Sequence, residues 1–261
     1  MARPTRQRSI AIGILAGLAL AADACGGSGG DGDTGGTKAG DGSTGLPRGS
    51  EKVSLDPADF SAQIDNPYWP MNPGARWVYH EHENGSTQRI EVTVTNDTKK
   101  VAAGITGVVV HDVATEDGAK VEDTYDWYAQ DREGNVWYLG ENTTEYEDGK
   151  PASTKGSWEA GADGAQAGII VPAHPEVGMT YRQEYYAGEA EDEGRVLSVD
   201  EQAQVPFGHW DDVLMTKDYT RLEPKLLEHK FYARGIGPVL TLTVSGGSGR
   251  EELIDFTGAK P

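Results

Sequence analysis

The sequence predicts an all-β protein, an antiparallel meander that curves into a half-barrel or barrel. Three observations lead to this fold class. Apolar and polar residues alternate along many short segments, turn dipeptides separate those segments, and a faint internal repeat relates two parts of the chain. After residue 64, no segment offers three turns of an amphipathic helix.

The alternation is clearest in residues 90–95, where Ile90, Val92 and Val94 would share one face of a strand. Further short runs of apolar, β-branched or aromatic residues are 108–110, 125–128, 136–139, 213–215, 231–232 and 239–244. Hairpin turns are predicted at Asn84-Gly85, Asp117-Gly118, Glu133-Gly134 and Asp148-Gly149. A proline-rich, aromatic segment, 66–74, predicts an extended lead-in before the first of these strands.

The internal repeat appears when the chain is shifted by 104 residues. Gly74 then falls on Gly178, and Tyr128 falls on Tyr232. The matches fall on turn glycines and inward strand positions, where a shared fold would require them. We therefore expect two duplicated β-units, 74–140 and 178–244, with a last strand at 250–256.

Residues 1–24 have the pattern of a signal peptide. Three arginines and no acidic residue precede an uninterrupted run of apolar or small residues, 10–22. As a helix this run would span only about 20 Å, which is shorter than the ~30 Å hydrocarbon core of a bilayer. We expect export of the chain and removal of this segment.

The single cysteine, Cys25, directly follows that segment. Its position resembles the lipobox of bacterial lipoproteins, which implies that Cys25 is a lipid attachment site carrying acyl chains such as palmitate. That family usually has Leu three residues before the cysteine and a small uncharged residue two before it, whereas this chain has Ala22 and Asp23. The order Ala22-Asp23-Ala24 also fits an ordinary secretory cleavage site, which would leave the protein secreted without a lipid.

Residues 25–50 predict a lipidated cysteine followed by a disordered, glycine-rich tether. The segment 26–50 contains 11 of the 35 glycines and no aromatic residue, so it cannot bury enough apolar surface to fold. Residues 51–261 form the predicted β-domain, with 38 acidic and 18 basic side chains. This acidic charge argues against nucleic-acid binding and against electrostatic attraction to anionic lipids.

Several segments resemble a known group of proteins. NPYWPMNPGARWVY, YDWYAQDREGNVWYLGE, VPFGHWDDVLMTKDY and FYARGIGPV look like an uncharacterised family of exported bacterial lipoproteins. The same pattern is distantly similar to the half-barrel envelope proteins related to lipoprotein carriers. The second resemblance implies a barrel-like fold with a cleft for an apolar ligand.

The first candidate site is a metal site at His80 and His82. Alternation on a strand places these two residues on one face, with Glu81 and Glu83 on the other. Neutral imidazoles suit zinc or copper, and a third ligand could come from His111, Asp112 or Glu91. The alternative interpretation is a solvent-facing polar row, with no metal or other cofactor.

Acidic and aromatic residues offer weaker signals. Acidic pairs such as Glu122-Asp123 lie near predicted turns, where we expect solvated side chains. The numerous tryptophans and tyrosines could line a ligand cleft or simply form the core of the sheet.

The sequence lacks the usual catalytic signatures, including nucleophile-elbow, phosphate-loop, dinucleotide and zinc-protease motifs. We therefore expect a noncatalytic, extracytoplasmic binding module, anchored to the bacterial cell membrane by lipid, for an apolar small molecule or an envelope protein. Two alternatives stay open. One is a metal-binding envelope protein or enzyme using His80 and His82, and the other is a structural or adhesive surface domain.

Overall fold

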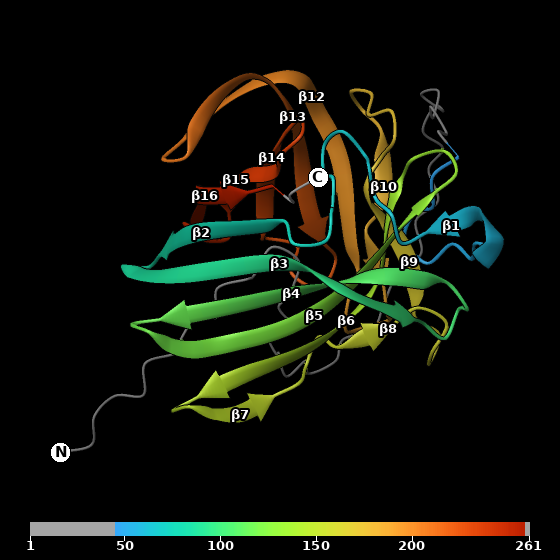
Figure 1. The fold of residues 1–261 in the computed structure, drawn as a ribbon, viewed down its shortest axis with the longest axis horizontal. Coiled ribbons are helices and arrows are strands. Elements are labelled where there is room, and N and C mark those ends of the chain that lie inside the picture. Colours follow the sequence, from blue (N-terminus) through green and yellow to red (C-terminus); the bar gives the residue numbers. More distant parts are fainter. Residues whose placement is uncertain (1–44, 259–261) are drawn as a thin grey trace, which may run out of the picture.

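The computed structural model describes residues 45–258, so the predicted signal peptide, Cys25 and the tether up to residue 44 lie outside the described residues. The predicted all-β class is confirmed. Within 45–258 the chain forms one nearly closed antiparallel sheet, with a single 3₁₀ turn, η1 (Pro57–Asp59), and no α-helix (Figure 1). In the same range no helix is long and apolar enough to cross a membrane.

The sheet contains sixteen strands. They are β1 (Phe60–Ser61), β2 (Arg76–Glu83), β3 (Ser86–Lys100), β4 (Thr106–Glu116), β5 (Ala119–Asp131), β6 (Val136–Glu147), β7 (Lys150–Ser153), β8 (Trp158–Glu159), β9 (Gln166–Val171), β10 (Thr180–Arg182), β11 (Glu184–Tyr185), β12 (Asp192–Val205), β13 (Gly208–Thr220), β14 (Leu227–Ala233), β15 (Gly237–Ser245) and β16 (Arg250–Thr257).

Hairpin turns set the register of the long strands. Asn84 and Gly85 both have positive φ, 50° and 80°, as the two central residues of a tight hairpin turn require. Asp117-Gly118 and Asp148-Gly149 repeat this geometry, so these three predicted turns are confirmed. With the turns fixed, period-two alternation turns Ile90, Val92 and Val94 into the barrel.

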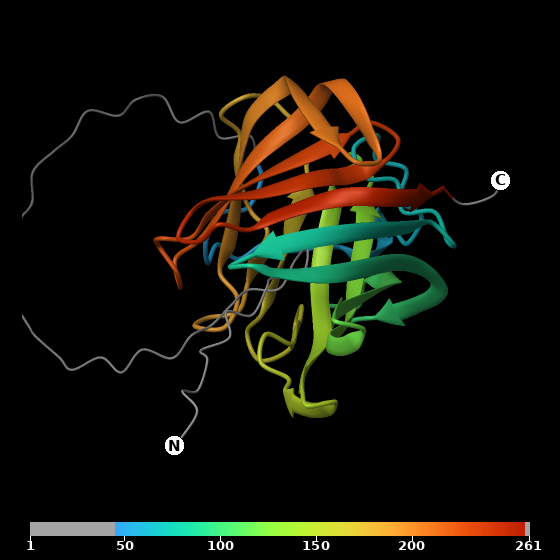
Figure 2. The same ribbon diagram turned by 90° about the vertical axis from the view of Figure 1, so that its left-hand side faces the viewer.

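The strand order is β10-β12-β13-β14-β15-β16-β2-β3-β4-β5-β6-β9-β11. β10 and β11 follow one another in the chain but pair with opposite edges of the sheet, β12 and β9. One short segment, 180–185, therefore joins both edges and nearly closes the barrel (Figures 1 and 2). Closure leaves few strand edges open to pairing with other chains.

Gly168 and Arg182 hold this seam together. A side chain at Gly168 on β9 would clash with the backbone of Gln183, so only glycine allows the two edges to come this close. The fully buried Arg182 guanidinium donates to the carbonyl oxygens of Ala167, Gly49 and Glu51 at 2.6–3.2 Å. The last residues of the predicted tether, 45–50, therefore lie against the seam.

The strand order agrees with the predicted repeat. At an offset of 104 residues, β2 corresponds to β10, and β3, β4, β5 and β6 correspond to β12, β13, β14 and β15. In both sets the strands are antiparallel neighbours in this same order. β16 joins the two meanders into one sheet by pairing with β15 and β2. The barrel thus consists of two similar halves with one strand between them.

The lead-in before β2 covers one end of the barrel. Tyr68, Trp69 and Met71 are almost completely buried there. The Trp69 ring contacts Tyr128 of one half and Tyr232 of the other, with ring centroids 5.6 and 6.2 Å apart. These two tyrosines are the pair that the repeat superposes, so one tryptophan packs against the same position of both halves and fills this end.

Candidate functional site: the acidic interior of the barrel

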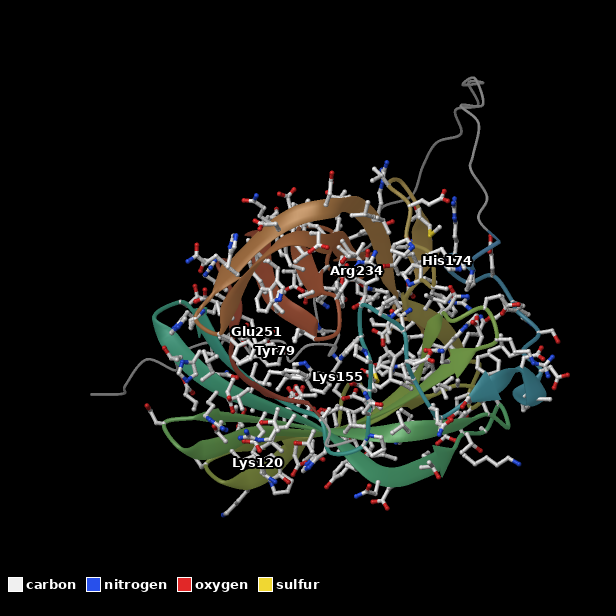
Figure 3. All side chains as sticks on the ribbon, turned by 45° about the horizontal axis from the view of Figure 1, so that its top comes forward. Tyr79, Lys120, Lys155, His174, Arg234 and Glu251 are labelled. Atoms are coloured by element: carbon white, nitrogen blue, oxygen red, sulfur yellow. The ribbon has the colours of Figure 1, made fainter. Side chains whose placement is uncertain are left out.

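The inward side chains change from aromatic to acidic along the barrel. On each strand the residue nearest the lead-in is aromatic and the residue farthest from it is acidic. The inward residues, listed in that direction, are Tyr128, Asp126, Thr124 and Glu122 on β5, Tyr232, Lys230 and Glu228 on β14, and Trp77, Tyr79 and Glu81 on β2. Figure 3 shows Tyr79 and Glu251 among the side chains inside the sheet. The end near Trp69 is an aromatic core, and the acidic layer lies beyond it.

Eight carboxylic side chains are buried in the described part of the chain, a density that soluble proteins avoid unless the charges are compensated. We refer to these eight, with the half-buried Asp192 and Glu228, as the acidic interior. The eight are Glu81, Asp112, Glu122, Asp126, Glu141, Glu184, Asp218 and Glu251.

One half of the acidic interior contains a cation of its own. The Lys230 Nζ lies 3.2 Å from Asp218 Oδ2. Asp218 also accepts hydrogen bonds from the Gln183 amide at 3.0 Å and the Thr216 hydroxyl at 2.7 Å. Burial lowers the pKa of Lys230, but the negative charges of Asp218 and Glu228 more than offset this, and its pKa is raised overall. Lys230 is therefore a permanent counterion in this half.

The other half, on β4 to β6, has no such cation among the described residues that act on its Asp112, Glu122, Asp126 and Glu141 carboxyls. Burial raises the pKa of Glu184 on β11, and the charge of Lys230 opposes this rise. Asp126 of β5 and Glu141 of β6 are direct cross-strand partners on the inner face. Like charges at such a position destabilise a sheet. The Tyr138 hydroxyl lies between them, 2.8 Å from Asp126 Oδ1 and 2.9 Å from Glu141 Oε2.

Several buried acceptors of the interior have no hydrogen-bond partner among the described residues. Glu184 is 2% exposed; its Oε2 accepts from the Trp158 indole at 2.9 Å, but its Oε1 has no partner. Glu81 Oε2 and the hydroxyl of Tyr128 are in the same state. A buried acceptor without a donor costs about 1–3 kcal/mol, so these atoms indicate a place for donors that residues 45–258 do not supply.

The pKa values of the interior carboxyls are raised, chiefly because burial disfavours the ionised form. Burial, followed by the charge of Glu251, raises the pKa of Glu81 to about 9. Burial also raises the pKa of Glu251 to about 8, and the pKa values of Glu122 and Asp126 to about 7. Much of the acidic interior is therefore protonated at neutral pH unless a cation enters it.

His80 and His82 lie on the outer face of β2, while Glu81 between them points inward. Their ring centroids are 6.2 Å apart, and His82 Nδ1 lies 2.9 Å from the Thr87 hydroxyl. Within residues 45–258 no three His, Cys, Asp or Glu side chains are grouped so that they could hold a metal ion. The histidine pair stays a metal-site prediction for which the described residues offer no third ligand.

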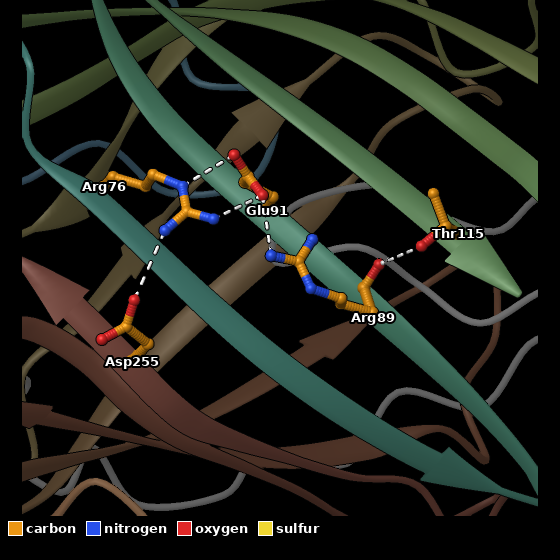
Figure 4. Close-up of polar contacts among 5 residues, drawn as sticks. All are labelled: Arg76, Arg89, Glu91, Thr115 and Asp255. Carbon is orange, nitrogen blue, oxygen red and sulfur yellow. Dashed lines mark hydrogen bonds and ion pairs between the residues drawn. The ribbon is translucent and has the colours of Figure 1, made fainter. Parts of the chain in front are cut away.

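The three additional ligands considered for that site are engaged elsewhere. Asp112 is buried inside the barrel, and His111 Nε2 lies 2.7 Å from Asp123 Oδ1. Glu91 accepts two hydrogen bonds from Arg76, at 2.7 and 2.6 Å, and one from Arg89 at 2.8 Å (Figure 4). These bonds, opposed by partial burial, lower the pKa of Glu91 to about 2.

A pocket lies next to the lead-in. It has a volume of about 500 Å³, and its lining includes Tyr68 as well as His174 and Arg234, which Figure 3 labels. The Arg234 guanidinium stacks 4.2 Å from the Tyr68 ring centroid and donates to its hydroxyl at 2.5 Å. Its lining combines Arg234 with the carboxylates Asp65, Glu133 and Glu176.

The acidic interior was missed by the sequence interpretation. The expectation that Glu122-Asp123 is a solvated turn pair is wrong for Glu122, which is 6% exposed and points inward from β5. A usable signal did exist for Asp126, which shares the inward phase of β5 with Tyr128. For Glu141 it did not, because a register shift in β6 places Tyr138 rather than Leu139 opposite Tyr128. Acids at the apolar phase of a strand indicate either a wrong register or a buried charged site.

No family model and no curated protein matches the chain. Two crystal structures resemble its fold at low similarity. One is described as a "putative exported protein with YmcC-like fold" from Bacteroides fragilis, with TM-score 0.44, 12% identity, and coverage of 73% of this chain and 99% of the other. The second is described as a "putative lipoprotein" from Parabacteroides distasonis, with TM-score 0.41, 12% identity, and coverage of 74% and 99%. Likeness at this level supports no statement about what this chain binds.

Proposed function

We propose that this protein is an exported, noncatalytic binding module whose barrel interior binds a protonated organic amine. The observation that carries the proposal is the buried Glu184 Oε1 within an acidic interior, an oxygen to which no residue in 45–258 donates a hydrogen bond. An ammonium group supplies both the positive charge that the carboxyls need and the N–H donors that the unpartnered oxygens need. A quaternary ammonium ion supplies the charge without the donors.

Aromatic side chains beside the acids also favour an organic cation. The Tyr138 ring stacks on Tyr128 with centroids 5.0 Å apart and meets the Trp158 ring edge-on at 5.2 Å. Such faces attract cations and cover the methylene groups of an alkylamine. The acidic layer makes an amine a better candidate for the interior than the wholly apolar ligand that the distant resemblance implies.

The proposed location of the protein is extracytoplasmic, at the cell membrane. The signal-peptide pattern and the cysteine that follows it support lipid attachment at Cys25. Incorporation of a labelled fatty acid into the protein, compared with a Cys25→Ala variant, tests this. Labelling of both proteins, or of neither, contradicts lipid attachment at Cys25.

Thermal unfolding and calorimetric titration of the purified protein with spermidine, cadaverine and tetramethylammonium test amine binding. We expect saturable binding of the two N–H-bearing amines, a raised melting temperature, and much weaker binding of tetramethylammonium and of the diol that matches cadaverine. Glu184→Gln keeps the size of the side chain and removes its charge, and we expect at least a tenfold loss of affinity. Glu147→Gln, an exposed change on β6, serves as the control and leaves binding unchanged.

Three outcomes would overturn the amine proposal. Equal affinity for the amine and its neutral diol would favour an apolar ligand. If the protein binds a metal ion and the His80→Ala and His82→Ala variants lose it, the metal-binding alternative is favoured. An absence of small-molecule binding, with a protein partner recovered by cross-linking on the cell surface, would favour an adhesive or structural domain.

A further inference from the structure

The Tyr138 hydroxyl contacts two buried carboxyls. Its oxygen lies 2.8 Å from Asp126 Oδ1 and 2.9 Å from Glu141 Oε2. All three side chains are buried; Asp126 is 4% exposed and Glu141 is 2% exposed. We refer to Asp126, Tyr138 and Glu141 as the carboxyl–phenol triad.

Counting hydrogens shows that the triad holds an extra proton. A phenol has one O–H hydrogen and can donate it to only one of the two carboxyl oxygens. The second oxygen–oxygen contact needs its own hydrogen, and only a protonated carboxyl can provide one by donating to the phenol oxygen. Two ionised carboxylates facing each other across the strand pair would repel. One of the two carboxyls is therefore protonated in this arrangement.

The groups around the triad reinforce this state. Those that face it are Asp112 from β4, Glu122 and Tyr128 from β5, and Glu184 from β11. All of them are acidic or neutral, so they disfavour a second negative charge in the triad. Burial raises the pKa of Asp126 to about 7, and burial together with the charge of Asp126 raises the pKa of Glu141 well above its usual value.

We propose that the carboxyl–phenol triad releases its proton when an amine binds, so that amine uptake is coupled to proton release and acidification discharges the ligand. This rests on the proposed amine-binding function. The exchange balances: R–NH₃⁺ and a carboxylic acid give the R–NH₃⁺ carboxylate ion pair and one H⁺, which passes to the solvent. No covalent bond of the ligand changes.

Linkage determines the direction and size of the pH effect. If one proton leaves for each amine bound, the binding constant rises about tenfold per pH unit wherever the triad is protonated in the free protein. The dependence flattens at higher pH, once the triad has lost its proton without ligand. Binding is therefore weaker in mildly acidic solution than at neutral or alkaline pH.

The test has two readouts, one of which needs no ligand. Infrared difference spectroscopy of the free protein at about pH 6 should show the carbonyl stretch of a protonated carboxylic acid. The double variant Asp126→Asn with Glu141→Gln should lose part of this band, because both amides keep their size but cannot ionise. The exposed Glu147→Gln variant should keep all of it. A wild-type spectrum without the band overturns proton storage, whatever the protein binds.

Calorimetry with spermidine in buffers of low and high ionisation enthalpy counts the protons released on binding. We expect release of about one proton more from the wild-type protein than from the double variant, which also binds at least tenfold more weakly. Equal release from both proteins overturns the role of the triad but leaves amine binding intact. An absence of heat in every buffer, with no other sign of binding, contradicts the proposed function and the coupling together. Circular dichroism of each variant confirms that the barrel has formed.

Discussion

The two halves of the barrel carry opposite charges at the same inward position. The repeat superposes Asp126 of β5 on Lys230 of β14, and both precede by two residues a tyrosine that packs against Trp69. In the second half the ammonium of Lys230 neutralises Asp218 permanently. In the first half the same position carries the carboxyl of Asp126, which faces other carboxyls instead of a cation. One half thus compensates its buried charges internally, whereas the other depends on protons or on a ligand.

The largest effect is expected from removal of the internal cation. Lys230→Met keeps most of the side-chain volume but leaves Asp218 and its neighbours without their counterion. We expect a loss of about 3–5 kcal/mol in the free energy of unfolding at neutral pH, measured by chemical denaturation. The exposed Lys225→Met variant should stay within about 0.5 kcal/mol of the wild type. Equal losses for the two variants would show that Lys230 does not stabilise the interior.

The next effect is an unusual dependence of stability on pH. The raised pKa values of Glu81, Glu251, Glu122 and Asp126 mean that the folded protein binds more protons than the unfolded chain between about pH 5 and pH 9. Stability contributed by the protonated carboxyls is fully present below their unfolded pKa values and is lost as pH rises through the folded ones.

We therefore expect the ligand-free protein to lose about 3 kcal/mol or more of unfolding free energy from about pH 5 to pH 9. Denaturation at several pH values measures this, and a saturating amine should reduce the loss. Stability that rises steadily over the same range would show that the interior carboxyls are ionised when empty.

A substitution that makes the two halves alike tests the comparison directly. Asp126→Lys places an ammonium in the first half, as Lys230 does in the second. We expect it to reduce spermidine affinity at least tenfold, about 1.4 kcal/mol, because the new cation occupies the position of the ligand charge. Glu147→Lys adds the same charge on the exposed surface of β6 and serves as the control. Unchanged affinity in Asp126→Lys would place the amine elsewhere.

The smallest effect is expected on the outer face, where a carboxylate behaves in the opposite way. The hydrogen bonds from Arg76 and Arg89 lower the pKa of Glu91 despite its partial burial, so its contribution is present above the unfolded pKa and is lost as pH falls through about 2. We expect Glu91→Gln to cost about 0.5–1 kcal/mol at neutral pH, since the ion pairs are partly exposed. Denaturation in high salt should shrink the difference. A cost equal to that of Lys230→Met would mean that exposure does not weaken this network.

The fold class was accessible from the sequence because it depends on local patterns. Period-two alternation specifies strands, and Asn84-Gly85, Asp117-Gly118 and Asp148-Gly149 specify hairpins whose residues must adopt positive φ. The repeat also predicted that two similar meanders would build the sheet. Alternation and turn chemistry involve residues close together in the chain, so they can be recognised without knowing which distant strands pair with each other.

The candidate site was not accessible in the same way. Asp126 and Glu141 are fifteen residues apart, and Glu184 lies on a strand that reaches them only because the barrel closes. Alternation could show that Asp126 shares the phase of Tyr128, but it could not show that the acids face one another. The histidine pair attracted attention because its members are only two residues apart in sequence, although the structure puts no third ligand beside them in the part that it describes.

By itself, the sequence determined an all-β chain with two related units and a strong excess of acidic residues, because alternation, turn chemistry and charge are local or additive properties. Only the tertiary structure decided where that charge resides. Because the barrel closes through residues 180–185, inward acidic side chains face one another across its interior. In the second half Asp218 lies against Lys230, and in the first half Asp126 and Glu141 lie opposite each other. The reason is physical: the energy of a charge depends on its burial and on its neighbours across the barrel, and a linear sequence contains neither.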